Sequence, residues 1–235
     1  MIAAPLGIPG RSLVAPFLRM AQGLNGLNEM NRAWGTLTHG HGWGWVESES
    51  QGEDRLHRSI GACWEDGSIE SLHDRNVLLL HARLASQGAV NEGNVHPFQA
   101  MVNGRRWSYC HNGTVKQALH VPTTLKKPDC TDSEIVFHHL LPYLETDPLR
   151  GLRTIYGGIH DYSCLNSFLL GPDALWAVCM YATTPDYYTL HLSVSDHGPI
   201  LSSEPLAEFG SHAPLANGQI LRIDRMQGTI DRFLL

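Results

Sequence analysis

Three short segments of the chain bring together residue types that can bind an amino acid and assist attack on an amide. They are residues 81–88 (HARLASQG), 94–98 (NVHPF) and 111–115 (HNGTV). Arg83 can hold a carboxylate through two parallel hydrogen bonds, because a planar guanidinium matches carboxylate geometry. In the third segment, an Asn side chain and the backbone N–H of the following Gly can stabilise the negative charge that develops on an attacked amide oxygen. The segments therefore indicate a site for a small amide.

Each of these residues also has a plain structural interpretation. Arg83 alone would more often pair with a nearby acid or cap a strand. Asn112 followed by Gly113 would more often be an ordinary turn. Asp132 can be a carboxylate in the first turn of a helix, stabilised by the helix dipole, and this does not prevent it from also binding an ammonium group. The functional interpretation therefore depends on the whole set occurring in order.

In that order, the segments resemble the class II glutamine amidotransferases. Members of this family read roughly His-x-Arg-x-Ala-Thr/Ser-x-Gly, then Asn-x-His-Pro-Phe, His-Asn-Gly and Asp-Ser-Glu, and here the last triplet is 132–134. Residues 39–46 (HGHGWGWV) resemble a glycine-tryptophan turn that precedes these motifs in single-domain members. Residues 202–206 (SSEPL) match a late Ser-Glu-Pro-Leu element. The resemblance therefore covers nearly the whole chain.

The resemblance implies both a fold and an activity. The fold is α+β, a four-layer αββα sandwich of two antiparallel sheets as in N-terminal-nucleophile hydrolases, with residues 1–235 as one glutamine amidotransferase domain. The activity is that of an amidohydrolase or amidotransferase on glutamine or a γ-glutamyl amide, with no cofactor. No synthetase, phosphoribosyl or sugar-isomerase domain follows, so we expect ammonia to be released or passed to a separate enzyme.

The same resemblance assigns a role to each candidate residue. Asn112 and Gly113 correspond to the oxyanion hole, Arg83 to the group that holds the α-carboxylate and Asp132 to the group that holds the α-ammonium. Ser86 corresponds to a hydroxyl that lines the site. His81, His96 and His111 are expected to form the hydrogen-bonding frame of the site rather than to act as catalytic bases. His96 is also expected among the substrate-binding residues.

The nucleophile of this family is an N-terminal cysteine, whose thiolate attacks the amide and whose own α-amine serves as the base. Residue 2 here is Ile. Because members often open Met-Cys-Arg, we expect Met-Cys-Arg to precede Met1, which places the cysteine about two residues upstream. The alternative is a catalytically inactive glutamine-binding or regulatory subunit. Use of the internal Cys110, which precedes His111, is less favoured because it has no α-amine.

Two positions depart from the family pattern. His41 stands where an acidic residue is common, and Gln87 replaces a frequent His. Both departures leave the exact substrate open.

Composition argues against several other classes of function. The net charge is −6, so no electrostatic binding to nucleic acid or to an anionic membrane is expected. The longest apolar stretches are too short to span a bilayer, and no signal peptide is evident. Five scattered cysteines favour reduced thiols and a cytoplasmic location. Fourteen histidines suggest a metal hydrolase, but no HExxH or paired-cysteine spacing occurs, so no metal is expected.

Local patterns predict the elements that position these residues. The apolar spacing in 12–32 predicts an amphipathic helix, and the polar segment 47–55 predicts a loop. Asn103 and Gly104 predict a hairpin turn. A capping-box pattern beginning at Thr131 predicts a helix over 132–145. Strands are predicted at 1–9, 76–85, 98–102, 107–115, 168–170, 174–182, 188–194, 198–202, 219–223 and 228–233.

Overall fold

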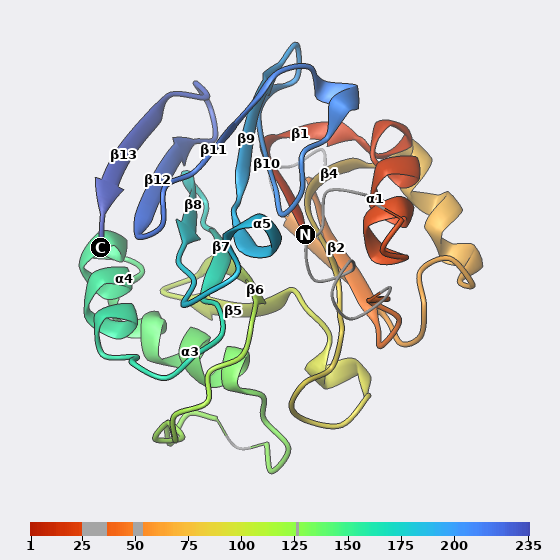
Figure 1. The fold of residues 1–235 in the computed structure, drawn as a ribbon. Helices are drawn as coiled ribbons and strands as arrows, with labels where there is room; N and C mark the ends of the chain where they lie inside the picture. Colours follow the sequence, from red (N-terminus) through yellow and green to blue (C-terminus); the bar gives the residue numbers. More distant parts are fainter. Residues whose placement is uncertain (25–36, 49–53, 126) are drawn as a thin grey trace.

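The computed structural model describes residues 1–24, 37–48, 54–125 and 127–235. In this part of the chain, one sheet has seven strands: β1 (Ile2–Pro9), β2 (Trp43–Ser48), β3 (Asp54–Ser59), β4 (Asn76–Ala82), β9 (His191–Ser195), β10 (Gly198–Ser202) and β11 (His212–Pro214). The second sheet has six: β5 (Phe98–Val102), β6 (Arg105–Asn112), β7 (Asn166–Leu170), β8 (Ala174–Cys179), β12 (Gln219–Asp224) and β13 (Ile230–Leu234). Their orders are β11-β9-β10-β1-β4-β2-β3 and β13-β12-β8-β7-β6-β5, antiparallel throughout (Figure 1).

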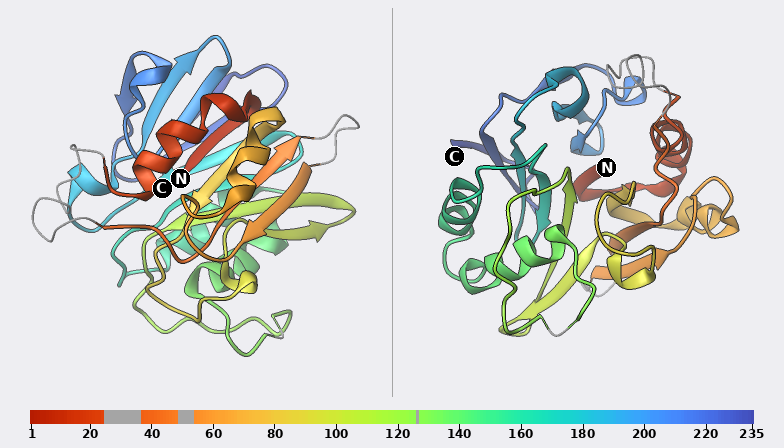
Figure 2. Two further views of the ribbon diagram at one scale, coloured as in Figure 1. Left: turned by 90° about the vertical axis from the view of Figure 1, so that its right-hand side faces the viewer. Right: turned by 60° about the horizontal axis from the view of Figure 1, so that its bottom comes forward.

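Helices cover the outer face of each sheet, and Figure 2 shows them on opposite sides of the molecule. α1 (Val14–Ala21) and the 3-10 helix η2 (Gly67–Asp74) share an apolar cluster with the seven-stranded sheet. α3 (Asp132–Leu140) and α4 (Pro148–Gly157) share another with the six-stranded sheet. A third cluster lies between the sheets, which confirms the four-layer αββα sandwich. The remaining helical turns are η1 (Gly10–Ser12), η3 (Glu92–Asn94), η4 (Leu141–Tyr143), α5 (Pro185–Tyr188) and η5 (Ala207–Phe209).

Alternation along β8 shows how the sequence produces these layers. Leu175, Ala177 and Cys179 belong to the cluster between the sheets. Trp176 and Val178, at the intervening positions, belong to the cluster that includes α3 and α4. Successive side chains of a strand point to opposite faces. A strand covered on both faces therefore needs apolar residues throughout, as in this strand.

The first residue of the chain lies deep in the sandwich. β1 runs between β10 and β4 in the middle of its sheet. Met1 and Ala3 belong to the cluster between the sheets, whereas Ile2 belongs to the cluster shared with α1. The α-amino group of Met1 donates to Ser203 Oγ at 2.9 Å, and its carbonyl oxygen accepts from the Ser203 N–H at 3.0 Å. These bonds fix the start of β1 at one end of the layer between the sheets.

The predicted strands are largely confirmed, and the hairpin turn is confirmed in detail. Asn103 and Gly104 have φ values of +49° and +78°, the two positive values that a type I′ turn requires. The strand predicted at 76–85 ends earlier, at Ala82. The loop predicted over 47–55 was wrong at both ends, because β2 continues to Ser48 and β3 begins at Asp54.

The helix predictions needed larger corrections. α3 begins where predicted but ends at Leu140, because Pro142 has no N–H to continue the helical hydrogen bonds. α1 ends at Ala21, and Gly23 follows with a φ of +67°, while the rest of the predicted helix falls outside the described residues. α4 was not predicted at all. No helix of the described residues is long and apolar enough to cross a membrane.

Candidate active site

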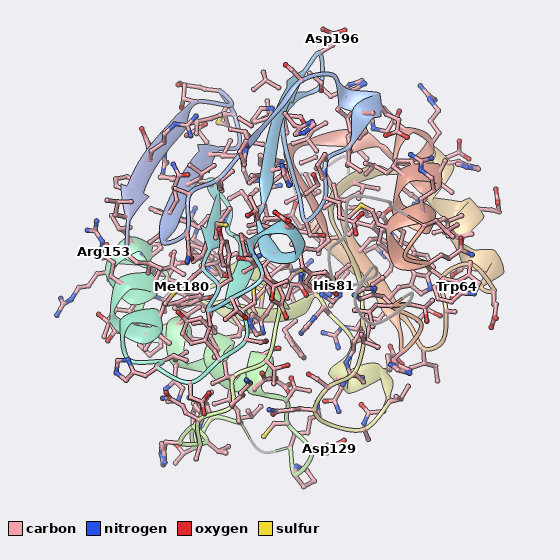
Figure 3. All side chains as sticks on the ribbon, in the orientation of Figure 1. Trp64, His81, Asp129, Arg153, Met180 and Asp196 are labelled. Carbon is pink, nitrogen blue, oxygen red and sulfur yellow. The ribbon has the colours of Figure 1, made fainter. Side chains whose placement is uncertain are left out.

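A cavity of about 270 Å³ opens where the ends of β4 and β6 meet the start of α3. Since β4 and β6 belong to different sheets, the cavity lies at one end of the layer between them. His81 lines it and is labelled near the middle of Figure 3. All six residues expected at the site from the sequence line it as well: Arg83, Ser86, His96, Asn112, Gly113 and Asp132.

Three buried histidines form a connected frame in the cavity wall. His81 Nε2 lies 3.2 Å from the His111 carbonyl oxygen and 3.1 Å from His96 Nδ1. A carbonyl oxygen can only accept, which assigns the His81 proton to Nε2 and makes His96 Nδ1 an acceptor. His111 Nε2 donates to the Cys164 carbonyl oxygen at 3.1 Å, and its Nδ1 lies 2.8 Å from the Ser133 hydroxyl.

Burial keeps these rings neutral near pH 7. Desolvation lowers the pKa of His81, and the neighbouring His96 lowers it further. Desolvation also lowers the pKa of His96 and of His111, against an opposing effect of Asp132 on His111. Neutral rings with fixed donors and acceptors can orient neighbouring groups but do not readily take up a proton. This supports the prediction that the three rings frame the site rather than act as bases.

Asn112 and Gly113 present two hydrogen-bond donors at the cavity lining. Gly113 has a φ of +131°, and a Cβ there would lie 2.0 Å from the Cys164 carbonyl oxygen, so a side chain does not fit. No described residue accepts a hydrogen bond from the Gly113 N–H or from the side-chain amide of Asn112. Within the described part of the chain, both donors thus lack an acceptor, and a pair of such donors is the kind of group that forms an oxyanion hole.

Arg83 follows β4 and is held against the cavity by the loop after it. Its side chain donates to the carbonyl oxygens of Gln87 at 2.7 Å, Ala89 at 3.3 Å and Gly88 at 3.5 Å. Desolvation lowers the pKa of Arg83, but an arginine remains charged at neutral pH. A guanidinium has five N–H donors, so these bonds leave others for a carboxylate.

The loop that holds Arg83 is anchored in turn by Asp129, labelled below His81 in Figure 3. The Asp129 carboxylate accepts from the Ala89 N–H at 3.3 Å and from the Asn94 side chain at 3.0 Å. Asp129 also lies shortly before the start of α3 in the sequence. Its hydrogen bonds therefore connect the loop around Arg83 to the segment that carries Asp132.

Asp132 is the first residue of α3, which Thr131 caps by accepting from the Glu134 N–H at 3.2 Å. Asp132 Oδ2 accepts from the Val115 N–H at 2.7 Å, and Oδ1 has a long contact of 3.4 Å with the Ser133 hydroxyl. The carboxylate thus lies at the positive end of the helix dipole while one of its oxygens retains capacity for a ligand.

Two further contacts join the segments that follow β4 and β6. Ser86 Oγ lies 2.8 Å from Thr114 Oγ1, and Gln87 Nε2 donates to the Val115 carbonyl oxygen at 3.0 Å. Gln87, which departs from the family pattern, therefore forms part of the wall. His41, the other departure, accepts on Nδ1 from the Ala85 N–H at 3.0 Å and so fixes the chain just after β4.

Several side chains of the cavity were missed in the sequence. Tyr187 and Tyr188 of α5 line it, as do Leu37, Thr114 and Ser163. The two tyrosines belong to the connection between β8 and β9, and no spacing links them to the motifs. The nearest signal was Thr184-Pro185-Asp186, a typical helix start, which shows that a turn is present but not that it reaches the site.

Comparison with known proteins identifies the family. A model described as class II glutamine amidotransferases matches residues 24–154, more than half of the chain. This chain belongs to the class II glutamine amidotransferases. A Haemophilus influenzae protein provisionally named as a glutamine amidotransferase is 28% identical over an alignment of 130 residues, and the match covers 51% of this chain and 43% of that protein. The matched region thus spans less than half of the curated relative.

Solved structures of the same class share the fold. A glutamine aminotransferase class II domain protein from Silicibacter pomeroyi is 22% identical, with a TM-score of 0.61, and the match covers 82% of this chain and 91% of that one. Glutamine phosphoribosylpyrophosphate amidotransferase from B. subtilis is 14% identical, with a TM-score of 0.62, and the match covers 83% of this chain and 43% of that one. At these identities the likeness establishes the N-terminal-nucleophile type of sandwich and no finer property.

Proposed function

We propose that this amidotransferase hydrolyses glutamine or a γ-glutamyl amide at the cavity between β4, β6 and α3. The observation that carries the proposal is that one cavity collects a cation, a carboxylate and two available N–H donors from three separate segments. These groups match the three polar parts of glutamine, namely its α-carboxylate, its α-ammonium and the oxygen of its side-chain amide. The acceptor of the ammonia would be water or a separate enzyme.

In the proposed reaction, Arg83 binds the α-carboxylate and Asp132 the α-ammonium. Asn112 and Gly113 hold the amide oxygen, which becomes negative as a thiol sulfur bonds to the carbonyl carbon. The C–N bond then breaks, and the nitrogen leaves as ammonia with the proton of the thiol. Water cleaves the resulting thioester to release glutamate and regenerate the thiol.

We propose an N-terminal cysteine ahead of Met1 as the source of the thiol. Met1 borders a small cavity of about 30 Å³ whose lining includes His39, His81 and Asn112, and these three also line the larger cavity. An extended chain advances about 3.3 Å per residue, so a residue about two positions ahead of Met1 can reach the shared region. Asn112, which the proposal assigns to the oxyanion hole, lines this shared region.

The surroundings of Met1 also suit an α-amine that acts as a base. Burial lowers the pKa of the Met1 amine to about 6, against the opposing effects of Glu204 and Cys110. The amine of the proposed cysteine would lie about two residues ahead of Met1, and comparable burial there would likewise favour the unprotonated form that accepts the proton of the thiol.

A glutamine-binding subunit without catalysis is the second candidate, and the positions of the cysteines favour it for the chain that begins at Met1. No described residue that lines the larger cavity is a cysteine. Cys110 is fully buried in the layer between the sheets, and desolvation raises its pKa, which disfavours its thiolate. Cys164 is buried as well, and burial raises its pKa in the same way.

Release of ammonia and glutamate from glutamine tests the proposal on three proteins. One begins at Met1, one carries Met-Cys-Arg ahead of Met1, and a control carries Met-Ser-Arg. We expect activity in the cysteine form alone. Binding of glutamine by all three without turnover would support the regulatory subunit, and activity in the serine form would exclude the N-terminal thiol.

A cytoplasmic location is part of the same proposal. All five cysteines are free thiols, and four of them are buried. Free thiols are typical of a reducing compartment, where disulfides rarely persist.

A further inference from the structure

The residues that line the cavity differ in character. Arg83 and Asp132 are charged, and the proposed function assigns them to the amino-acid part of the substrate. Tyr187, Tyr188 and Leu37 add large apolar and aromatic surface, from segments that belong neither to the loop after β4 nor to α3. The proposed function leaves this second surface without a role.

The one-turn helix α5 holds the two tyrosines in place. Thr184 starts it with φ +60° and ψ +61°, a left-handed conformation that a β-branched residue rarely adopts. The Thr184 carbonyl oxygen accepts from the N–H groups of Tyr187 and Tyr188, both at 3.1 Å. The side chain of Asn166 donates to the Tyr188 carbonyl oxygen. Unfavourable backbone geometry of this kind persists where surrounding contacts enforce it, and it clusters at ligand sites.

The two rings form a paired aromatic surface. Their centroids are 4.8 Å apart and their planes meet at 87°. Both rings are half-buried, and desolvation raises the pKa of each phenol, so both stay neutral. Ser163 is near enough to Tyr188 to affect the pKa of its phenol, and Ser163 Oγ accepts from the Thr114 N–H at 3.0 Å. The pair is therefore connected to the strand end that carries Asn112 and Gly113.

In the proposed binding mode, the tyrosines would lie on the side of the scissile bond away from the amino-acid end. Besides desolvation, the nearby Glu204 carboxylate raises the pKa of the Tyr187 phenol, and Glu204 lines the small cavity beside Met1 and Asn112. A substrate anchored at Arg83, with its carbonyl at Asn112, would point its amide nitrogen toward this region. Glutamine carries only hydrogen atoms on that nitrogen and leaves the aromatic surface uncovered.

We propose that Tyr187 and Tyr188 form a subsite for a substituent on the amide nitrogen, and that the preferred substrate is a γ-glutamyl amide of an aromatic amine. The inference rests on the proposed function and specifies its substrate. Edge-to-face and offset contacts between aromatic rings are favourable beyond the area that they bury. The reaction balances as for glutamine: the thiol sulfur bonds to the carbonyl carbon, the C–N bond breaks, and the amine leaves with the thiol proton. Water then releases glutamate.

Calorimetric titration tests the subsite without any need for turnover, with glutamine and γ-glutamyl anilide as the two ligands. The chain that begins at Met1 is suitable, because binding does not require the thiol. We expect the anilide to bind about tenfold more tightly than glutamine, as one additional aromatic contact predicts. Equal or weaker binding of the anilide would overturn the inference and leave the proposed function standing. Binding of neither ligand would overturn both.

Two substitutions at one position separate ring contact from general damage. Tyr187→Ala should remove most of the advantage of the anilide, measured as the ratio of the dissociation constants of glutamine and the anilide in the same variant. Tyr187→Phe keeps the ring and should retain the advantage. Equal losses for both ligands in Tyr187→Ala, or loss of the advantage in Tyr187→Phe, would contradict a role for the ring in binding the amine.

Discussion

Substitution of Gly113 by alanine should destabilise the protein far more than a typical glycine substitution. The new Cβ would lie 2.0 Å from the Cys164 carbonyl oxygen, whereas real Cβ contacts are essentially never closer than 3.0 Å. That carbonyl oxygen, which accepts the hydrogen bond from His111 Nε2, must therefore move by about an ångström. Loss of this buried bond costs about 1–3 kcal/mol. The positive φ adds roughly 1–3 kcal/mol, against a total stability of about 5–15 kcal/mol.

Two other glycines of the chain provide matched controls. Gly104 has a φ of +78°, and a Cβ at this position would have no neighbouring atom within 4 Å, so Gly104→Ala should show the backbone cost without a clash. Gly157, at the end of α4, has neither a positive φ nor a close neighbour, so Gly157→Ala should be neutral or stabilising by up to about 1 kcal/mol.

Urea denaturation of the three variants measures the series directly. We expect the midpoint to fall most for Gly113→Ala, slightly for Gly104→Ala and not at all for Gly157→Ala, with the slope m unchanged. If Gly113→Ala lowered the urea midpoint no more than Gly104→Ala, the close approach of Gly113 to Cys164 would not be what fixes the cavity wall at Asn112 and Gly113.

Three further predictions concern the site. In the form with an N-terminal cysteine, Asn112→Ala should lower turnover of glutamine about 10²–10³-fold with little change in stability, and unchanged turnover would remove Asn112 from the oxyanion hole. Arg83→Lys should raise KM for glutamine roughly tenfold to a hundredfold through loss of a paired, charge-assisted hydrogen bond, and an unchanged KM would exclude the carboxylate contact. Stability should fall as the pH is lowered from about 7 to about 5, because His81 and His96 have lowered pKa values and only the unfolded chain can protonate them near pH 6.5. Melting temperatures across this interval check the sign, and a rise would contradict it.

Local signals in the sequence were sufficient for much of the site. Thr131 caps α3 as its spacing to Glu134 predicted, because a capping box needs only residues within one turn. The hairpin turn at Asn103 followed in the same way from two residues that tolerate positive φ. Arg83 and Asn112 were predicted from motifs, and both line the cavity because their motifs lie at the ends of β4 and β6, which belong to different sheets.

Features that depend on tertiary contacts were not predictable from the sequence. Asp129 controls the loop around Arg83 through bonds to Ala89 and Asn94, and no spacing rule connects these positions. Tyr187 and Tyr188 reach the cavity only because the β8–β9 connection turns back over it. The end of α3 is a different case, because Pro142 is a local signal that stops the helix at Leu140 and the predicted range ran past it.

The most direct test of the central claim, that this cavity is a glutamine site, is calorimetric titration of glutamine into the chain that begins at Met1. Both the enzyme and the regulatory subunit require this binding. We predict saturable binding at one site, with a dissociation constant of about 1 μM to 1 mM, and a loss of affinity in Asp132→Asn. The absence of binding to the folded protein, or equal affinity in Asp132→Asn, would contradict the account.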